Sequence, residues 1–274
     1  MSDFKVIDWN ALPSFEASFF KTGSAISIGG FDGLHLGHMA LLEELKKKAK
    51  GMLKGVLTFY TPPAYMLSTS SKHGLISTWR LKKEKLIRLG FDFAILVDFS
   101  SNFAKMRAED FVELLKKYLN LEFLVVGDDF HFGYNRISSI EDMHCLSCKF
   151  SFVFEAVKPL VIGEKVQKVS SSLLRTCIYE GNVEYVNSLL GEPFTVDLLD
   201  LTPCVIEGKE LRFRRGDILQ VLPKDGKFEG AVCFNASAFE EKAVVLLDEN
   251  YLRLIFANME LNKVLPCLDR LKFI

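Results

Sequence analysis

The chain has 274 residues, of which 49 % are hydrophobic and 25 % charged, a composition typical of a soluble globular protein with one large domain or two. A formal net charge of −1 gives no indication of a nucleic-acid or membrane partner, and no apolar run approaches the ~20 residues of a membrane span. The N-terminus lacks the basic-then-apolar layout of a signal peptide, so we expect a cytoplasmic protein whose six cysteines are reduced.

The first two-thirds of the chain alternates short apolar runs with amphipathic stretches. The apolar runs predict strands at 24–28, 55–60, 93–99, 123–127 and 150–157. The amphipathic stretches predict helices at 36–50, 79–89 and 108–119, with inward faces formed by Met39, Leu41, Leu42 and Leu45 and by Phe111, Leu114, Leu115 and Tyr118. This alternation is typical of a Rossmann-like α/β fold, a doubly wound parallel sheet with both faces covered.

The texture changes after the sequence GEP at 191–193. From there, apolar β-type runs are separated by turn signals such as RGD and KDGK, and they predict strands at 218–222, 230–234, 243–247 and 252–256. We therefore predict an α/β domain over 1–191 and a small β-rich domain over 192–274.

Two loops follow predicted strands of the α/β domain. The sequence GGFDGLHLGH (29–38) follows the first strand, and Gly127-Asp128-Asp129 follows the fourth. Ligands of open α/β sheets bind at the carboxyl ends of the strands, near the point where strand order reverses. Glycine clusters serve tight turns or the close approach of a ligand. Both loops are therefore candidate site loops.

The first loop has the residues needed to bind a nucleotide phosphate. A glycine-rich turn that leads into a helix presents backbone N–H groups to phosphate. His35 and His38 stand at the start of that helix, where they can reach an α-phosphate and stabilise the charge of an in-line displacement. Gly37 allows a base or ribose close to the backbone. Two roles stay open for Asp32, namely capping the turn or positioning the nucleotide and Mg²⁺.

The cysteines give no comparable signal. His144, Cys145 and Cys148 form a CxxC with a neighbouring histidine, but a structural zinc site needs four ligands and no second pair follows at suitable spacing. We interpret Cys145 and Cys148 as ordinary thiols in a loop or edge strand, and we predict no protein metal site.

Four motifs in order resemble a known family. The HxGH pattern resembles the signature of the nucleotidylyltransferase superfamily, and GFDGLHLGH (30–38) closely resembles the first motif of bacterial FAD synthetases, the FMN adenylyltransferase half of the bifunctional riboflavin kinase/FMN adenylyltransferases. VGDDFHFGYNR (126–136) resembles their flavin-side motif. VSSSLLR (169–175) resembles their triphosphate clamp, with Ser172 in the threonine place. EGNV (180–183) and LLGEPF (189–194) resemble the end of that half, so the resemblance covers about residues 20 to 194.

The resemblance implies an enzyme that makes FAD and pyrophosphate from ATP and FMN with Mg²⁺, by direct attack of the FMN phosphate on the ATP α-phosphate. It implies His35, His38 and Arg175 as catalytic residues. It implies nucleotide binding by Gly30, Phe31, Asp32, Gly37, Ser171 and Ser172, and flavin binding by Phe59, Asp129, Phe130, Phe132 and Arg136. These roles are physically sensible, because serines before a helix suit β- and γ-phosphates and an arginine one turn later offers them a planar donor fork.

Two departures from the family pattern matter. The family commonly has F-[DE]-P-H-P after its second strand, whereas this chain has Phe59-Tyr60-Thr61-Pro62-Pro63. The kinase motif G-[FY]-P-T-A-N is missing after residue 192, so we predict that riboflavin kinase activity is lost. The C-terminal domain is then either a kinase-like barrel kept as a scaffold or another small β-fold.

Two alternatives to the FMN adenylyltransferase hypothesis stay open. One is adenylyl or cytidylyl transfer to another acceptor, such as a pantetheine or nicotinate mononucleotide, although the GDDFHFG stretch favours flavin. The other is a non-catalytic flavin- or nucleotide-binding protein. The sequence does not indicate an oligomeric state.

Overall fold

The computed structural model describes residues 3–60, 74–98, 103, 105–130, 139–162, 167–234, 239–257 and 265–274. The chain divides into two compact units. The first comprises Met1–Leu67 and Lys83–Lys168, and the second comprises Ser68–Lys82 and Val169–Ile274. The chain therefore leaves the first unit, contributes a short segment to the second, and returns.

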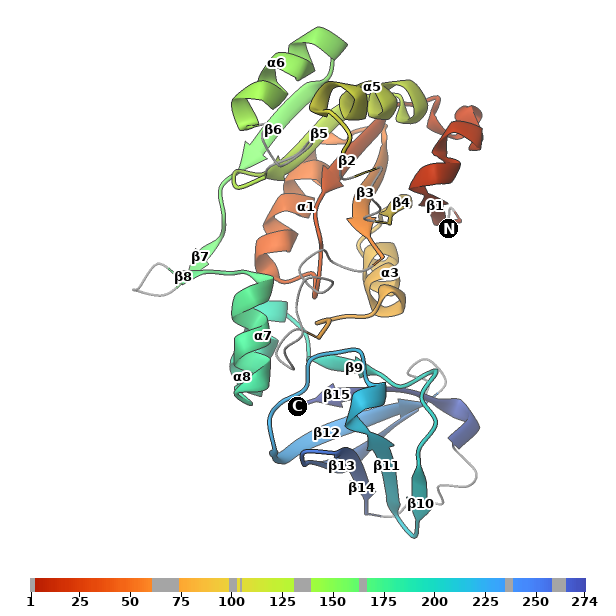
Figure 1. Ribbon diagram of the computed structural model, residues 1–274, viewed down its shortest axis with the longest axis vertical. Helices are drawn as coiled ribbons and strands as arrows, with labels where there is room; N and C mark the ends of the chain where they lie inside the picture. Colours follow the sequence, from red (N-terminus) through yellow and green to blue (C-terminus); the bar gives the residue numbers. More distant parts are fainter. Residues whose placement is uncertain are drawn as a thin grey trace. The chain divides into compact units, whose positions relative to one another are not determined.

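The first unit is built on a six-stranded sheet in the order β1-β4-β3-β2-β5-β6, and every neighbouring pair is parallel. Its strands are β1 (Lys5–Asp8), β2 (Ser24–Ile28), β3 (Leu53–Phe59), β4 (Phe93–Val97), β5 (Leu121–Gly127) and β6 (Val153–Val157). Its helices are α1 (Leu36–Lys48), α5 (Ala108–Leu119), α6 (Ile140–Phe150) and most of α3 (Trp79–Arg88). Helices α1 and α3 cover one face of the sheet, and α5 and α6 cover the other (Figure 1). The predicted doubly wound α/β fold is confirmed.

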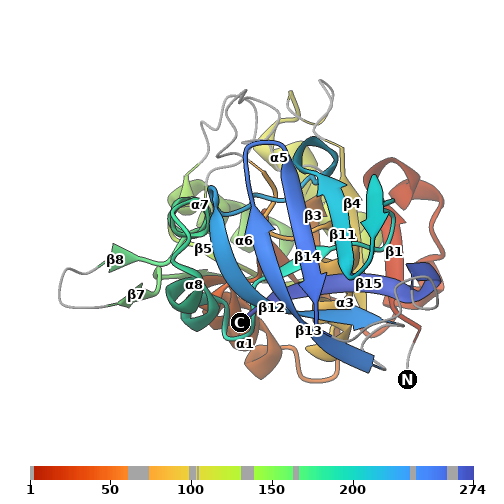
Figure 2. The same ribbon diagram turned by 90° about the horizontal axis from the view of Figure 1, so that it is seen from below.

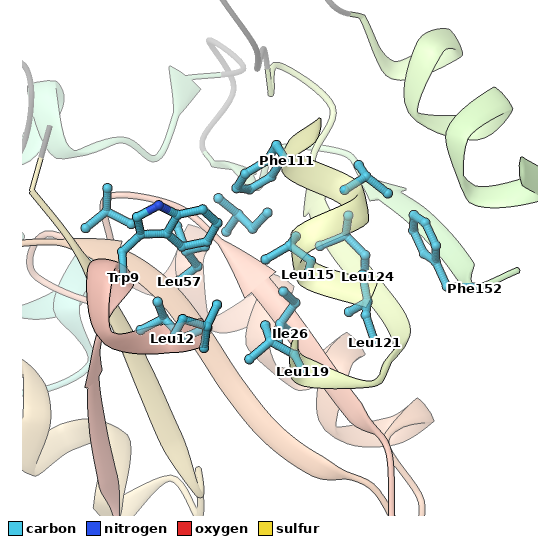
Figure 3. Close-up of a cluster of buried hydrophobic side chains, with 14 of the residues drawn as sticks. Trp9, Leu12, Ile26, Leu57, Phe111, Leu115, Leu119, Leu121, Leu124 and Phe152 are labelled. Carbon is cyan, nitrogen blue, oxygen red and sulfur yellow. The ribbon is translucent and has the colours of Figure 1, made fainter. Parts of the chain in front are cut away.

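The core of this unit explains why its central strands are mostly apolar. All five residues of β2 and all five of β4 are buried, because helices cover both faces of the sheet. Figure 3 shows side chains of α5 packed on those of the strands, with Trp9 and Leu12 contributed by the short 3-10 helix Trp9–Ser14. The Trp9 ring stacks on Phe111 with 5.7 Å between centroids. Each such side chain contributes about 1.5–3 kcal/mol by leaving water.

The strand order reverses at β2. From β2 the chain proceeds to β3 and β4 on one side, then returns to place β5 on the other side of β2. Ser27 of β2 pairs with Val125 of β5, so the two strands end at the same edge of the sheet. The loop after β2 and the loop after β5 therefore both lie at the carboxyl edge, at the topological switch point.

The described part of the second unit contains the start of α3, two further α-helices and an antiparallel sheet. The two further helices are α7 (Ser171–Tyr179) and α8 (Val183–Leu190). The sheet has the order β10-β11-β14-β13-β12-β15-β9. Its strands are β9 (Thr195–Asp197), β10 (Val205–Glu207), β11 (Glu210–Arg214), β12 (Gly226–Phe234), β13 (Phe239–Leu247), β14 (Tyr251–Phe256) and β15 (Leu268–Phe273). Strands β11 to β14 can be followed by their labels in Figure 2. The β-rich character predicted for this region is confirmed.

Three local predictions are wrong. The strand predicted from residue 150 begins at Val153, because 140–150 forms helix α6, and Cys145 and Cys148 lie exposed on that helix rather than in a loop or edge strand. The strand predicted at 218–222 is irregular chain with a single bridge, between Gln220 and Leu75. Strands β1, β9, β10, β11 and β15 were not predicted. Phe99, the predicted end of the third strand, lies outside the described residues.

The boundary near residue 192 follows a change in sequence texture rather than compactness, and it stays a prediction. The compact division instead groups α7 and α8 with the antiparallel sheet. Within the described ranges, no helix is long and apolar enough to cross a membrane.

Candidate functional site

The loop after β2 is a tight turn with three residues in the left-handed region. Phe31, Gly33 and Leu34 have φ values of 46°, 81° and 44°. Phe31 and Leu34 are bulky residues for which this conformation is strained by about 1–3 kcal/mol each. Both side chains are completely buried, and that burial offsets the strain. The loop is therefore held in one shape by two apolar anchors.

The backbone at Gly30 is fixed but borders open space. The Thr58 hydroxyl donates a hydrogen bond to the Gly30 carbonyl at 3.1 Å, and the Gly29 N–H donates to the Leu57 carbonyl at 3.1 Å. A Cβ added at Gly30 would meet no described atom within 4 Å. Such a rigid backbone with no side chain suits close approach of a ligand.

His35 caps helix α1, and its imidazole lies against that of His38. The Nδ1 atom of His35 accepts the backbone N–H of His38 at 3.3 Å, and the two rings stack with centroids 3.7 Å apart at an interplanar angle of 17°. The Phe31 ring lies edge-on to the His38 imidazole, with 5.3 Å between the ring centroids. Because Nδ1 of His35 is an acceptor, its proton is on Nε2, which makes that atom a donor. A donor imidazole at a helix N-terminus is suited to binding a phosphate oxygen.

Asp32 lies in the same loop and is only 3 % exposed. Within the described ranges, no group of three or more His, Cys, Asp or Glu side chains could hold a metal ion. Mg²⁺ is commonly bound by one or two carboxylates together with substrate phosphates. The Asp32 carboxylate therefore fits a Mg²⁺ that arrives with a nucleotide, although capping of the turn stays an equally good role.

The loop after β5 presents a charged pair at the same sheet edge. Its backbone is pinned by hydrogen bonds from the Asp128 N–H to the Val157 carbonyl and from the Phe130 N–H to the Gly127 carbonyl, both at 3.0 Å. Asp129 is exposed and forms an ion pair with Lys168 of the short hairpin β7 (Val161–Ile162) and β8 (Gln167–Lys168). Lys168 was not among the predicted site residues.

The remaining flavin-side residues are only partly described. Phe130 and Phe59 are half-buried and pack against the hydrophobic core, so in both side chains part of the ring is already covered. The Phe59 ring lies edge-on to the Phe103 ring, with 6.3 Å between their centroids. Phe132 and Arg136 lie outside the described residues, as do Thr61, Pro62 and Pro63.

Tyr60 replaces the acidic residue of the family pattern, but a carboxylate lies beside it. The Tyr60 hydroxyl donates to the Asp8 carboxylate at 3.5 Å. Partial burial and the charge of Asp8 raise the pKa of Tyr60. Asp8 ends β1, so its carboxylate also lies at the carboxyl edge of the sheet. No local sequence signal indicates this pairing, because Tyr60 and Asp8 lie 52 positions apart in the chain.

In the second unit, the serine-rich motif forms the start of helix α7. Ser170 caps the helix by accepting the Leu173 N–H at 3.3 Å. Ser171 and Ser172 are the first two helical residues, rather than preceding the helix as predicted. Arg175 is half-buried, and its Nε donates to the Gly74 carbonyl at 3.0 Å. Hydroxyls and N–H groups at a helix N-terminus favour anions.

The predicted site residues are therefore divided between the two units. His35, His38 and the other residues of the two loops belong to the first unit, where they follow the adjacent strands β2 and β5. Ser171, Ser172 and Arg175 belong to the second unit.

The sheet is all-parallel and doubly wound with an HxGH loop at its switch point, which is the arrangement expected from the resemblance to the nucleotidylyltransferase superfamily. The FAD synthetase family matches residues 18–173, more than half of the chain. The chain belongs to the FAD synthetase family.

Curated relatives agree with this assignment. The chain is 32 % identical over 179 residues to a bifunctional riboflavin kinase/FMN adenylyltransferase of Buchnera aphidicola (subsp. Schizaphis graminum), covering 64 % of this chain and 57 % of the relative. It is 30 % identical over 194 residues to the protein of that name in Escherichia coli (strain K12), covering 70 % and 60 %. The chain thus spans about three-fifths of the relatives it matches.

A solved structure shares the fold over the entire chain. A crystal structure titled as a macrolide-efflux protein from Streptococcus pneumoniae superposes with a TM-score of 0.78 at 23 % identity, covering 100 % of this chain and 90 % of that one. At this identity the match shows the fold alone.

Proposed function

We propose that the protein is an FMN adenylyltransferase that makes FAD and pyrophosphate from ATP and FMN. The observation that carries the proposal is the His35–His38 pair. The two imidazoles stack at the N-terminus of α1, on a strained loop at the switch point of a parallel sheet. Membership of the FAD synthetase family supports FMN as the acceptor. The adenylyltransferase domain corresponds to the predicted range 1–191.

The FMN phosphate attacks the ATP α-phosphorus in line, and pyrophosphate leaves with its electron pair, so no covalent enzyme intermediate is needed. His35 donates from Nε2 and His38 stands beside it, and together they stabilise the charge on the α-phosphate oxygens. The nucleotide is bound on the side of the loop formed by Gly30, Phe31 and Gly37. Mg²⁺ supplies charge neutralisation of the triphosphate, and Asp32 is the residue of the loop suited to hold it.

Ser171, Ser172 and Arg175 bind the β- and γ-phosphates through hydroxyls, helix N–H groups and a guanidinium. Asp129 binds the polar edge of the flavin, with Phe59, Phe130, Phe132 and Arg136 assigned to the same ligand. The chain lacks the kinase motif after residue 192, so riboflavin is not phosphorylated. We propose a cytoplasmic enzyme acting on small molecules.

The test is incubation of the purified protein with Mg·ATP and either FMN or riboflavin, with chromatographic separation of the flavins. We expect FAD from FMN and no product from riboflavin. His38→Ala should lower kcat by about 10²–10³-fold, the effect of removing one preorganised charge-stabilising group. The matched control is His144→Ala, which removes an exposed histidine from α6.

Each other outcome has a definite meaning. FMN formed from riboflavin would show an unrecognised kinase site. A protein that forms no FAD from FMN would refute the proposed acceptor, and a thermal-shift screen of other phosphate acceptors would then identify the correct one.

A further inference from the structure

Arg175 is oriented by a segment that lies about a hundred residues earlier in the chain. Its Nε donates to the carbonyl of Gly74, which is 101 residues away in sequence. Both residues belong to the second unit. A guanidinium is planar and rigid, so a bond from Nε to a fixed carbonyl restricts the directions available to its two terminal amino groups. The position of Gly74 therefore restricts where this cation points.

Gly74 is held tightly against the backbone of 220–221. A Cβ added to it would lie 2.3 Å from the Val221 nitrogen and 2.7 Å from the Gln220 carbonyl carbon. The next residue, Leu75, donates to the Leu219 carbonyl at 3.0 Å and accepts from the Val221 N–H at 2.8 Å. Only glycine fits this close approach of two backbones. We call residues 74–80 the strap.

Gln220 is the buried hub that fixes the strap. The residue is only 4 % exposed, and both polar atoms of its side chain form hydrogen bonds within the protein. Nε2 donates to the Ile76 carbonyl at 2.9 Å and to the Thr195 carbonyl at 2.8 Å, and Oε1 accepts the Asp197 N–H at 2.7 Å. The strap is thereby tied to strand β9 of the antiparallel sheet.

The same stretch of chain also holds the helix that carries Arg175. The Lys224 N–H donates to the Tyr179 carbonyl at 2.8 Å, and the Lys224 ammonium pairs with Glu180 at 2.7 Å, at the end of α7. Residues 218–224 therefore fix both the arginine's helix and the carbonyl that the arginine contacts. Residues 218–222, though mostly apolar, form no strand because their backbone pairs with the strap at a single bridge.

We propose that Gly74, which Gln220 holds in place, is a positioning residue for Arg175. The antiparallel sheet of the second unit thereby takes part in nucleotide binding, because it orients this arginine toward the ATP triphosphate. The proposal rests on the proposed function, in which Arg175 binds the β- and γ-phosphates. The proposal gives the antiparallel sheet of the second unit a role that does not need riboflavin kinase activity.

The test is Gly74→Ala, compared with Gly216→Ala as the matched control. An added Cβ at Gly216 meets no described atom within 4 Å, and neither glycine has a positive φ. Gly74→Ala should raise the KM for ATP, and the Kd for a non-hydrolysable ATP analogue, by about tenfold, the effect of weakening one hydrogen-bonded charge. The KM for FMN should stay within twofold. Gly216→Ala should change neither constant.

A double-variant cycle shows whether the glycine acts through the arginine. Arg175→Ala should weaken ATP binding by itself, and adding Gly74→Ala to it should then have no further effect. The proposal would be overturned if Gly74→Ala weakened ATP binding equally in the wild-type and the Arg175→Ala backgrounds. It would also be overturned if Gly74→Ala left the ATP affinity unchanged. If Gly74→Ala fails to fold, Gln220→Glu replaces it, because a carboxylate keeps the shape and the Asp197 contact but cannot donate to Ile76 and Thr195.

The binding measurement separates this proposal from the proposed function. Absence of FAD synthesis with ATP binding that still depends on Gly74 would refute the acceptor and keep the positioning role. FAD synthesis with ATP binding independent of Gly74 would refute the positioning role alone. A protein that does not bind the ATP analogue at all would refute both.

Discussion

Replacement of Arg80 by alanine tests whether the strap is anchored by charge. The Arg80 guanidinium contacts Asp197 at 2.6 Å through Nη2 and Asp269 at 2.8 Å through Nη1. The side chains of Arg80, Asp197 and Asp269 are 24 %, 12 % and 4 % exposed. Arg80→Ala therefore leaves the poorly hydrated Asp197 carboxylate without its guanidinium, whereas Asp269 keeps its ion pair with Arg270. Thr78 keeps its own bond to Asp197 at 2.5 Å.

The expected cost follows from that burial. Removing one partner of a buried ion pair destabilises a protein by about 3–5 kcal/mol, and because Arg80 is partly hydrated we take the lower end, about 3 kcal/mol. For a unit of this size, that corresponds to a fall in Tm on the order of 10 °C. The assay is calorimetry or urea unfolding followed by circular dichroism.

The control is Arg107→Ala, which removes an arginine of similar geometry from an exposed place. Arg107 contacts Asp110 at 2.7 Å, but the two side chains are 73 % and 44 % exposed. Exposed pairs contribute at most about 1 kcal/mol. If the two variants lose the same free energy of unfolding, burial does not govern the Arg80 contacts and the reasoning fails.

Two further predictions follow from the same structure. Burial would raise the pKa of Asp197, but hydrogen bonds from Arg80 and Thr78 outweigh it and hold that pKa below its ordinary value of 3.8. The stability contributed by the Asp197–Arg80 pair is therefore complete above the pKa of Asp197 in the unfolded chain, and it is lost as the pH falls through the pKa in the folded protein. The difference in unfolding free energy between wild type and Arg80→Ala should therefore shrink below about pH 4. A difference that widens there would contradict this sign. In the other unit, Gly30→Ala places its Cβ in open space, so we expect an unchanged Tm with a KM for ATP raised about tenfold, and a normal KM would show that no ligand approaches this backbone.

The elements that the sequence predicted correctly are those whose local pattern and burial agree. Strands β2 and β4 are buried throughout, and their residues are apolar except for the two small serines of β2, Ser24 and Ser27. Helix α5 was predicted with its observed bounds, because its apolar residues recur at helical spacing. Helix α6 was missed because its polar residues and thiols obscure that periodicity. A signal was present, however, since Ser139 and Asp142 form a capping box at its start.

Other features could not be predicted, because their causes lie far away in the sequence. Strand β15 contains Asp269 and Arg270, which are 2 % and 7 % exposed, and two charged residues in a run are ordinarily assigned to the surface. They can be buried because Asp269 forms ion pairs both with its neighbour Arg270 and with Arg80, which lies 189 positions away in sequence. The motif comparison likewise located Arg175 and the histidine loop, but not the Gly74 carbonyl or the Asp8 carboxylate beside Tyr60, since contacts of this kind are specified by tertiary structure.

The hydrogen bond from Gln220 to the Ile76 carbonyl has a consequence for biosynthesis, because 144 residues separate its partners. At roughly 5–20 residues per second, a ribosome exposes the strap on the order of ten seconds before the residue that receives it. During that interval the strap has no backbone partner from 219–221, and closing so long a loop is intrinsically slow. The anchoring of Gly74, and with it the orientation of Arg175, therefore cannot precede the synthesis of residues 219–221. A nascent chain released before residue 220 would contain every motif of the family match and still lack an oriented Arg175.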